Sequence, residues 1–225
     1  GPKPAGAAAT YLRALCHRSA GALLKAAAAF QDVADRYPES ALHDYALLAK
    51  ADAFLKAKDY RSAAEEFARA ADRVKDENVR AEAELRAAGS VYLAGDMDSA
   101  LTLLRGVAER RQGSDVAARA QFLVGETLIG KKMYNEAIVE LNRVLATYFQ
   151  HSVAASAQYR IARCLDALGR QADATGTYQA VVSGYPLEPE APPAAYLAGV
   201  GLLAQGRSLA AAPYFQIVLD RYASR

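Results

Sequence analysis

The chain lacks any long apolar run, and no stretch approaches the roughly 20 residues that a membrane-spanning helix needs. Its 27 basic and 25 acidic residues are interspersed and sum to a net charge of only +2. No basic stripe of the kind that binds nucleic acid or anionic lipid is therefore present. These absences predict no direct membrane span and no nucleic-acid partner.

Residues that could carry out chemistry are also few and scattered. His17, His43 and His151 are the only histidines, and none has a second ligand at metal-binding spacing. Glu65 and Glu66 are neighbouring acids on a predicted helix surface, which is typical of solvated charges rather than of an acid/base pair. No nucleophile stands beside a base. We expect a non-enzyme with no cofactor and no metal in this segment.

What the sequence does contain is a repeat with an unbroken 37-residue period. Its reference column is alanine throughout: Ala26, Ala63, Ala100, Ala137, Ala174 and Ala211. Four residues later stand the bulky residues Phe30, Phe67, Leu104, Leu141, Tyr178 and Phe215. Seven residues later stand Val33, Ala70, Val107, Val144, Val181 and Val218. Spacing of i, i+4 and i+7 marks one face of a helix.

A second helix pattern precedes each column alanine. Twelve residues before it stand the small residues Ala14, Ala51, Ala88, Gly125, Ala162 and Gly199. Five residues before it stand Gly21, Gly95, Gly169 and Gly206, with Lys58 and Lys132 in the other two repeats. Glycine is expected there because helices commonly end on a left-handed residue. Each unit is thus a helix, a tight turn and a helix, and six stacked units form a continuous core.

The segments "DYRSAAEEFARA" (residues 59–70) and "YNEAIVELNRVL" (residues 134–145) resemble the tetratricopeptide repeat. The resemblance implies an all-α, right-handed α-solenoid that binds proteins or peptides on its concave side. The period is three residues longer than the family's usual 34, which we assign to longer connections. The pattern "A-x-Y-x-x-A … Y-x-x-V-V-x-x-Y-P" (residues 157–186) resembles a bacterial cell-envelope branch. That branch includes the Tol–Pal repeat protein and the repeat lipoprotein of the outer-membrane β-barrel assembly machinery. It favours the periplasm or cell envelope and leaves the cytoplasm open.

The period also predicts how the chain is divided. We expect residues 1–6 to be a tag remnant or disordered lead, and residues 7–225 to form a single domain. The predicted repeats are 7–43, 44–80, 81–117, 118–154, 155–191 and 192–225. Pro213 should remove a hydrogen bond unless the last helix begins late. Solenoids need polar caps, and no polar capping helix follows the last repeat. We therefore expect the chain to be a segment of a longer protein or to have something docked on its C-terminal end, and self-association through the uncapped ends stays open.

A partner would lie on the first helices, along three columns that stand 15, 11 and 8 residues before each column alanine. From the middle of these columns and from arginines beside them we select the partner-binding residues Tyr92, Phe122, Glu126, Tyr159, Arg163, Arg119, Arg160 and Tyr196. Aromatic residues flanked by charges are typical of protein-binding surfaces. A competing interpretation is that the tyrosines and leucines fill space between adjacent first helices. The columns lack the Lys and Asn of a chaperone-type carboxylate clamp.

Two further functions stay open at this point. A scaffold for polysaccharide export or cell-wall handling would stack aromatic rings on sugars, and an accessory region of a larger enzyme would use the same architecture. Cys16 and Cys164 occupy one column four repeats apart. That separation is too large for a disulfide on this fold, and we expect both to be buried thiols.

Overall fold

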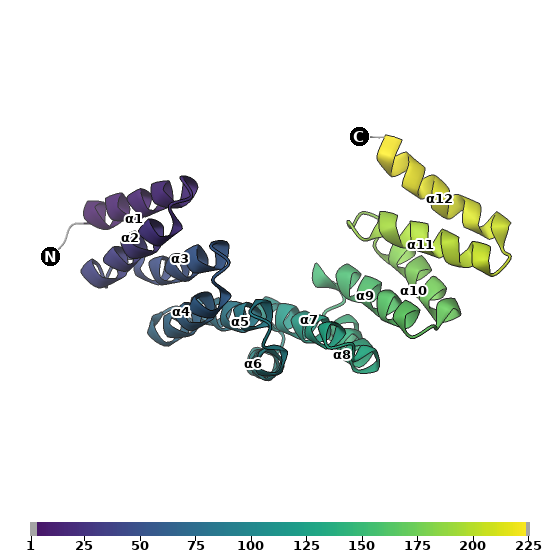
Figure 1. Ribbon diagram of the computed structural model, residues 1–225, viewed down its shortest axis with the longest axis horizontal. Helices are drawn as coiled ribbons and strands as arrows, with labels where there is room; N and C mark the ends of the chain where they lie inside the picture. Colours follow the sequence, from purple (N-terminus) through teal and green to yellow (C-terminus); the bar gives the residue numbers. More distant parts are fainter. Residues whose placement is uncertain (1–3, 224–225) are drawn as a thin grey trace. The chain divides into compact units, whose positions relative to one another are not determined.

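The computed structural model describes residues 4–223, and over this range the chain is all-α, with twelve helices and no strand (Figure 1). The helices are α1 (Pro4–Ser19), α2 (Leu23–Arg36), α3 (His43–Lys56), α4 (Tyr60–Arg73), α5 (Glu77–Leu93), α6 (Met97–Arg110), α7 (Asp115–Gly130), α8 (Tyr134–Thr147), α9 (Val153–Ala167), α10 (Gln171–Gly184), α11 (Ala191–Ala204) and α12 (Ser208–Ala223). They form six helix–turn–helix repeats, which confirms the predicted α-solenoid fold class.

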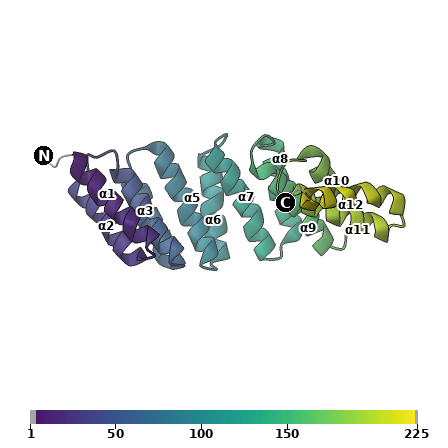
Figure 2. The same ribbon diagram turned by 90° about the horizontal axis from the view of Figure 1, so that it is seen from above.

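The chain divides into two compact units of three repeats each. The first unit is Gly1–Arg111 with α1 to α6, and the second is Gln112–Arg225 with α7 to α12. Within each unit every helix packs on the next helix along the chain. Figure 2 shows the paired helices from above. First helices of neighbouring repeats also touch, α3 with α5 and α7 with α9. No helix of the described range combines the length and apolarity that crossing a bilayer requires.

The 37-residue columns form the core as expected. Every column alanine is at most 1% exposed, and so are the bulky residues four positions later in the first five repeats. The small residues on the first helices allow close approach. A Cβ on Gly125 would stand 2.5 Å from the Leu141 side chain, and one on Gly199 would stand 2.8 Å from the Phe215 ring. Glycine replaces alanine there because there is no room for a methyl group.

The turn inside each repeat also follows the prediction. Gly21, Gly95, Gly169 and Gly206 all have positive φ, between 73° and 91°. Lys58 and Lys132 adopt the same conformation, with φ of 61° and 59°. The backbone geometry of the turn is therefore kept even where the side chain makes it costly. In the first unit Asp59 and Asp96 cap the helices that follow, each accepting a hydrogen bond from a backbone N–H three residues on.

The structure differs from the sequence-based expectations at residues 4–6 and at Cys16, and at Pro213 it has the expected loss of a hydrogen bond. Residues 4–6, expected in a disordered lead, form the first turn of α1. Pro213 lies inside α12, which begins at Ser208, so this helix does not begin late and lacks one backbone hydrogen bond. Cys164 is buried as expected, but Cys16 is exposed. Both cysteines lie on the side of a first helix that meets the preceding repeat, and no described residue precedes α1 to cover Cys16.

Candidate partner-binding site

The predicted site residues fall in both units. Tyr92 lies half-buried on α5 in the first unit. The other seven residues all lie in the second unit, on its first helices α7, α9 and α11. The candidate site is accordingly described for the second unit, on the face that these three first helices present.

A cavity of ≈ 310 Å³ opens on this face. It is lined by Phe122, Ser156, Tyr159, Arg160, Pro189, Glu190 and Pro193. Three of these residues were selected from the sequence, and the structure brings them together from α7 and α9. The other four come from α9 and from the start of α11 with its preceding connection. The prolines before and at the start of α11 are the sequence feature that could have indicated these last cavity residues. They belong to no column of the repeat, so the periodicity alone does not select them.

Charged groups at the cavity are partly engaged with one another. The Arg160 Nε atom lies 2.8 Å from the Glu126 Oε1 atom. Burial raises the pKa of the Glu126 carboxyl above its ordinary value, and Arg160 opposes that rise. On the cavity wall the Ser156 hydroxyl donates a hydrogen bond to the Glu190 carboxylate. Glu126, expected to face a partner, is thus largely used to hold α7 and α9 together.

The same ion pair recurs in the first unit. Arg86 on α5 donates to Asp52 on α3, with one nitrogen–oxygen distance of 3.0 Å. In both pairs the arginine stands 14 residues before the column alanine of its own repeat. The carboxylate stands 11 residues before the column alanine of the preceding repeat. Arg86 also lies over the Phe67 ring, with its Cζ atom 4.6 Å from the ring centre. Cross-repeat ion pairs between first helices are therefore a recurring feature that sequence reasoning missed.

Arg163 is different from these paired arginines. It occupies the column that holds Asp52 and Glu126 in other repeats, and α11 offers Leu197 rather than a charged group at the matching position. Arg163 is exposed and makes no ion pair within the described residues. Its pKa lies above the ordinary arginine value, mainly because of a hydrogen bond to the Tyr159 hydroxyl. Arg163 is thus an exposed cation without a direct carboxylate contact, and it lies beside Tyr159, which lines the cavity.

The aromatic residues of this face also support the fold. The Tyr159 ring lies 5.8 Å from the Tyr178 ring, and the Tyr196 ring lies 6.2 Å from the Phe215 ring. Each contact joins the two helices of one repeat. These two tyrosines therefore fill space within their own repeats, and Tyr159 also faces Phe122 of the neighbouring first helix across the cavity. Tyr196 nevertheless remains 53% exposed. Arg119, the last predicted residue, lies half-buried and 3.7 Å from Asp115.

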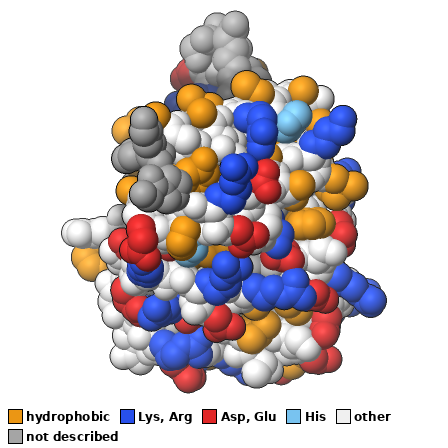
Figure 3. All heavy atoms as spheres, turned by 90° about the vertical axis from the view of Figure 1, so that its left-hand side faces the viewer, with side chains coloured by type: hydrophobic (Ala, Val, Ile, Leu, Met, Phe, Trp, Pro, Cys, Tyr) orange, Lys and Arg blue, Asp and Glu red, His pale blue; other side chains and the backbone are white. Residues whose placement is uncertain are grey.

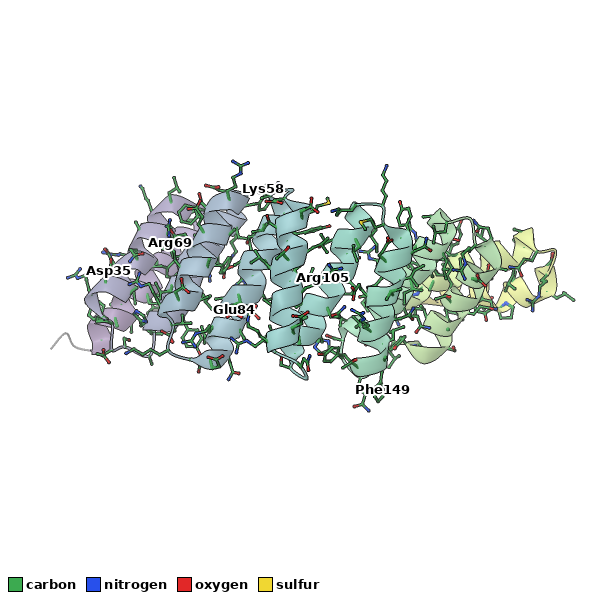
Figure 4. The ribbon with its side chains drawn as sticks, turned by 90° about the horizontal axis from the view of Figure 1, so that it is seen from below. Asp35, Lys58, Arg69, Glu84, Arg105 and Phe149 are labelled. Carbon is green, nitrogen blue, oxygen red and sulfur yellow. The ribbon has the colours of Figure 1, made fainter. Side chains whose placement is uncertain are left out.

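The first unit has a larger cavity, of ≈ 610 Å³, between α4, α5 and α6. Small apolar side chains line much of it, among them Ala64, Ala68 and Ala87. Figure 4 shows this side of the molecule, with Glu84 of α5 between Arg69 of α4 and Arg105 of α6. Among the described residues no cluster of three or more His, Cys, Asp or Glu could hold a metal ion.

Comparisons with known proteins agree with this architecture. Residues 3–114 match the family model "Tetratricopeptide repeat-like domain", and residues 156–187 match the model "Tetratricopeptide repeat". No curated protein matches the chain by sequence.

Solved structures share the fold at low sequence identity. MamA from Desulfovibrio magneticus RS-1 is 19% identical, with a TM-score of 0.60 over 81% of this chain and 96% of its own. The apo form of RapI is 15% identical, with a TM-score of 0.71 over 86% of this chain and 58% of its own. A putative kinesin light chain repeat protein from Podosopora anserina is 16% identical, with a TM-score of 0.60 over 80% of this chain and 95% of its own. At these identities the likeness shows the fold alone. Both family models describe tetratricopeptide repeats, so the chain is similar to that family over residues 3–114 and 156–187.

Proposed function

We propose that the chain is a non-catalytic protein-interaction scaffold that binds a peptide segment of a partner on the first-helix face of the second unit. One observation carries this proposal. An aromatic-walled cavity between Phe122 and Tyr159 lies beside Arg163, an exposed arginine without an ion pair. Arginine and aromatic residues dominate the binding energy of protein interfaces.

The chemistry of the site indicates what the partner segment carries. The cavity volume of ≈ 310 Å³ is at the lower end of the roughly 300–1,000 Å³ of small-molecule sites. It suits one bulky apolar side chain packed against the rings and prolines. A carboxylate nearby on the segment would accept a bidentate pair of hydrogen bonds from the Arg163 guanidinium. Arg119 and Tyr196 are proposed as flanking contacts, and Tyr92 as a separate contact on the first unit.

Capture from cell extract tests this proposal. Wild type is compared with Arg163→Glu, which changes an exposed side chain, and with Tyr159→Ala, which removes one wall of the cavity. Tyr148→Ala is the matched control, because Tyr148 is another half-buried tyrosine that packs on the same core cluster. We expect a protein that wild type and Tyr148→Ala retain and that both site variants lose. Equal capture by all four proteins would place the contact elsewhere.

The compartment of the partner is part of the same experiment. The resemblance of residues 157–186 to the envelope branch supports a bacterial envelope complex as the setting. Envelope and cytosolic fractions are therefore kept apart during capture. A partner found only in the cytosolic fraction would remove the envelope assignment and leave the binding site unaffected.

A carbohydrate-binding scaffold is the second candidate, and the exposed Tyr196 ring favours it because sugar stacking needs an open aromatic face. The chain has 13 tyrosines and no tryptophan, so soluble glycan fragments can be titrated against tyrosine fluorescence. Quenching that is lost in Tyr196→Ala would support this candidate over the protein-binding one.

A further inference from the structure

Consecutive repeats are joined by one recurring interface. The second helix of a repeat presents an outgoing face, and the first helix of the next repeat presents an incoming face. Between the first two repeats Phe30 and Val33 pack with Ala46 and Ala49. Between the last two repeats a Cβ on Gly201 would stand 3.1 Å from the Cβ of Thr175. Gly201 stands ten residues before the column alanine of its repeat, and Thr175 stands one residue after the column alanine of the preceding repeat. These two columns therefore meet at the interface between consecutive repeats.

At α12 the outgoing face is not covered by any described residue. This face comprises Ala212, Phe215, Val218 and Leu219, which occupy the outgoing columns of the earlier repeats. Phe215 and Val218 are partly exposed, whereas their counterparts Phe30 and Val33 are 0% exposed. Leu219 is 61% exposed, and its counterpart Ala34 is 1% exposed. The α12 face is thus a repeat interface without its second half.

At α1 the incoming face is uncovered within the described range in the same way. This face comprises Ala9, Leu12 and Cys16, all exposed. Leu12 is 60% exposed, and Cys16 is exposed although Cys164 in the same column is 1% exposed. Figure 3 views this end of the molecule and shows hydrophobic side chains at the surface among charged ones.

We propose that the α12 outgoing face of one copy binds the α1 incoming face of a second copy, continuing the repeat register between chains. The internal interfaces indicate the occupant, because each outgoing face in the array is covered by the first helix of the next repeat. The incoming columns of these helices hold small or apolar residues except for Ser90, Thr127 and the two arginines Arg86 and Arg160. Helix α1 has such residues, and neither face contains a charged side chain. The contact is heterologous, so it builds head-to-tail chains rather than closed symmetric dimers. It is independent of the peptide site proposed above.

Cysteine cross-linking tests the register directly. In this register Cys16 of one copy would meet residue 212 of another, in the columns that Gly201 and Thr175 occupy internally. Disulfides form when Cβ atoms are about 3.5–4.5 Å apart, close to the internal spacing. We expect Ala212→Cys to give a ladder of disulfide-linked multimers under mild oxidation. Cys164 should not compete, because burial raises the pKa of its thiol to about 11.

Two control variants define what the ladder means. Asp220→Cys places a thiol on the same helix in a column that is exposed in all six repeats, and it should give no ladder. Adding Cys16→Ser to Ala212→Cys should reduce the products to a single symmetric dimer at most. A ladder from Asp220→Cys as strong as that from Ala212→Cys would overturn the proposed register.

Sedimentation of complementary variants tests the polarity. Ala9→Glu disrupts only the incoming face, in a column that is a fully buried alanine in the other five repeats, and Leu219→Glu disrupts only the outgoing face. Both positions are already exposed, so folding is preserved. Each variant alone should lose the concentration-dependent increase in mass of wild type. An equimolar mixture should recover dimers and nothing longer, because one intact face of each kind remains. Wild type that stays monomeric throughout, or single variants that still dimerise, would refute head-to-tail binding.

Discussion

The two units use the same repeat but fill it differently. Each has an arginine–carboxylate pair between first helices, Asp52–Arg86 in the first and Glu126–Arg160 in the second. In the first unit the core cluster around Phe67 otherwise contains alanines. In the second unit one cluster runs from Leu141 to Ala198 and contains large apolar side chains. Beside its ion pair the first unit thus has mainly alanines around Phe67, whereas the second unit has bulkier apolar side chains beside its own ion pair.

The difference is visible at matched columns. Ala64 and Ala87 beside the ≈ 610 Å³ cavity of the first unit correspond to Ile138 and Ile161 in the second. Each buried methylene stabilises by about 0.8 kcal/mol, so two alanines in place of two isoleucines forgo several kcal/mol of local packing. Because solenoid stability is a sum over neighbouring repeats, we expect the first unit to open more readily than the second.

The largest expected effect comes from Phe67→Ala. Phe67 is 0% exposed, and truncating a buried phenylalanine costs about 3–5 kcal/mol. The ring also supports the Arg86 guanidinium, so the loss should fall at the upper end. Hydrogen exchange should rise throughout α3 to α6 and stay unchanged in α9 to α12. Uniform loss of protection over the whole chain would mean that the two units unfold as one.

The two ion pairs should contribute unequally to the free energy of unfolding, and this difference is smaller than the effect of Phe67→Ala. Arg86→Met removes two hydrogen bonds to a carboxylate and the ring contact, and should cost about 1.5–3 kcal/mol. Arg160→Met removes a single contact from a side chain that is 42% exposed, and should cost about 1 kcal/mol or less. Denaturant titrations of both variants, each paired with the amide variant of its carboxylate, measure the coupling. Equal coupling energies would show that the second hydrogen bond between Arg86 and Asp52 contributes nothing to the pair.

These pairs also mark the limit of prediction from the sequence. The helices, their turns and the buried columns follow from residues within one repeat, so a 37-residue period is enough to place them. Partners such as Asp52 and Arg86 are 34 residues apart, and their contact depends on the offset between neighbouring helices, which the period does not contain. The exposure of Cys16 against the burial of Cys164 likewise depends on what lies in front of a helix. Glu126 was placed on the correct helix, but its engagement with Arg160 could not be read from its column.

Acid should affect the two units in opposite directions. Partial burial acts to raise the pKa of Asp44, but hydrogen bonds from His43 and from the backbone N–H groups of Asp76 and Lys75 outweigh it and leave the pKa below its ordinary value. Such a group stabilises the fold above its ordinary pKa, and the contribution is lost as pH falls through the lower folded value. Burial raises the pKa of Glu126. Its contribution is complete below the ordinary value and is lost as pH rises through the folded one.

Thermal unfolding followed by circular dichroism between about pH 2 and 7 tests this contrast, because this range extends to both sides of the ordinary pKa values of Asp and Glu, about 3.9 and 4.3. Asp44→Asn should be less stable than wild type at neutral pH, and the difference should shrink on acidification. Glu126→Gln should gain on wild type as pH rises. Parallel pH profiles for the two variants would contradict the opposite pKa shifts.

The smallest effect should be the same in both units, which makes it a control on the comparison. Lys58 and Lys132 stand one in each unit, at φ of 61° and 59°. A left-handed backbone costs a non-glycine residue about 1–2 kcal/mol, and glycine avoids this cost. Glycine also has greater conformational freedom in the unfolded chain, which offsets about 0.5–1 kcal/mol of the gain. Lys58→Gly and Lys132→Gly should therefore each raise the free energy of unfolding by about 0.5–1 kcal/mol, measured by denaturant titration. Because the turn is local, packing density should not alter the gain. A gain confined to Lys58→Gly would mean that the more densely packed second unit already compensates its strained turn, so that turn energy and core packing are coupled rather than additive.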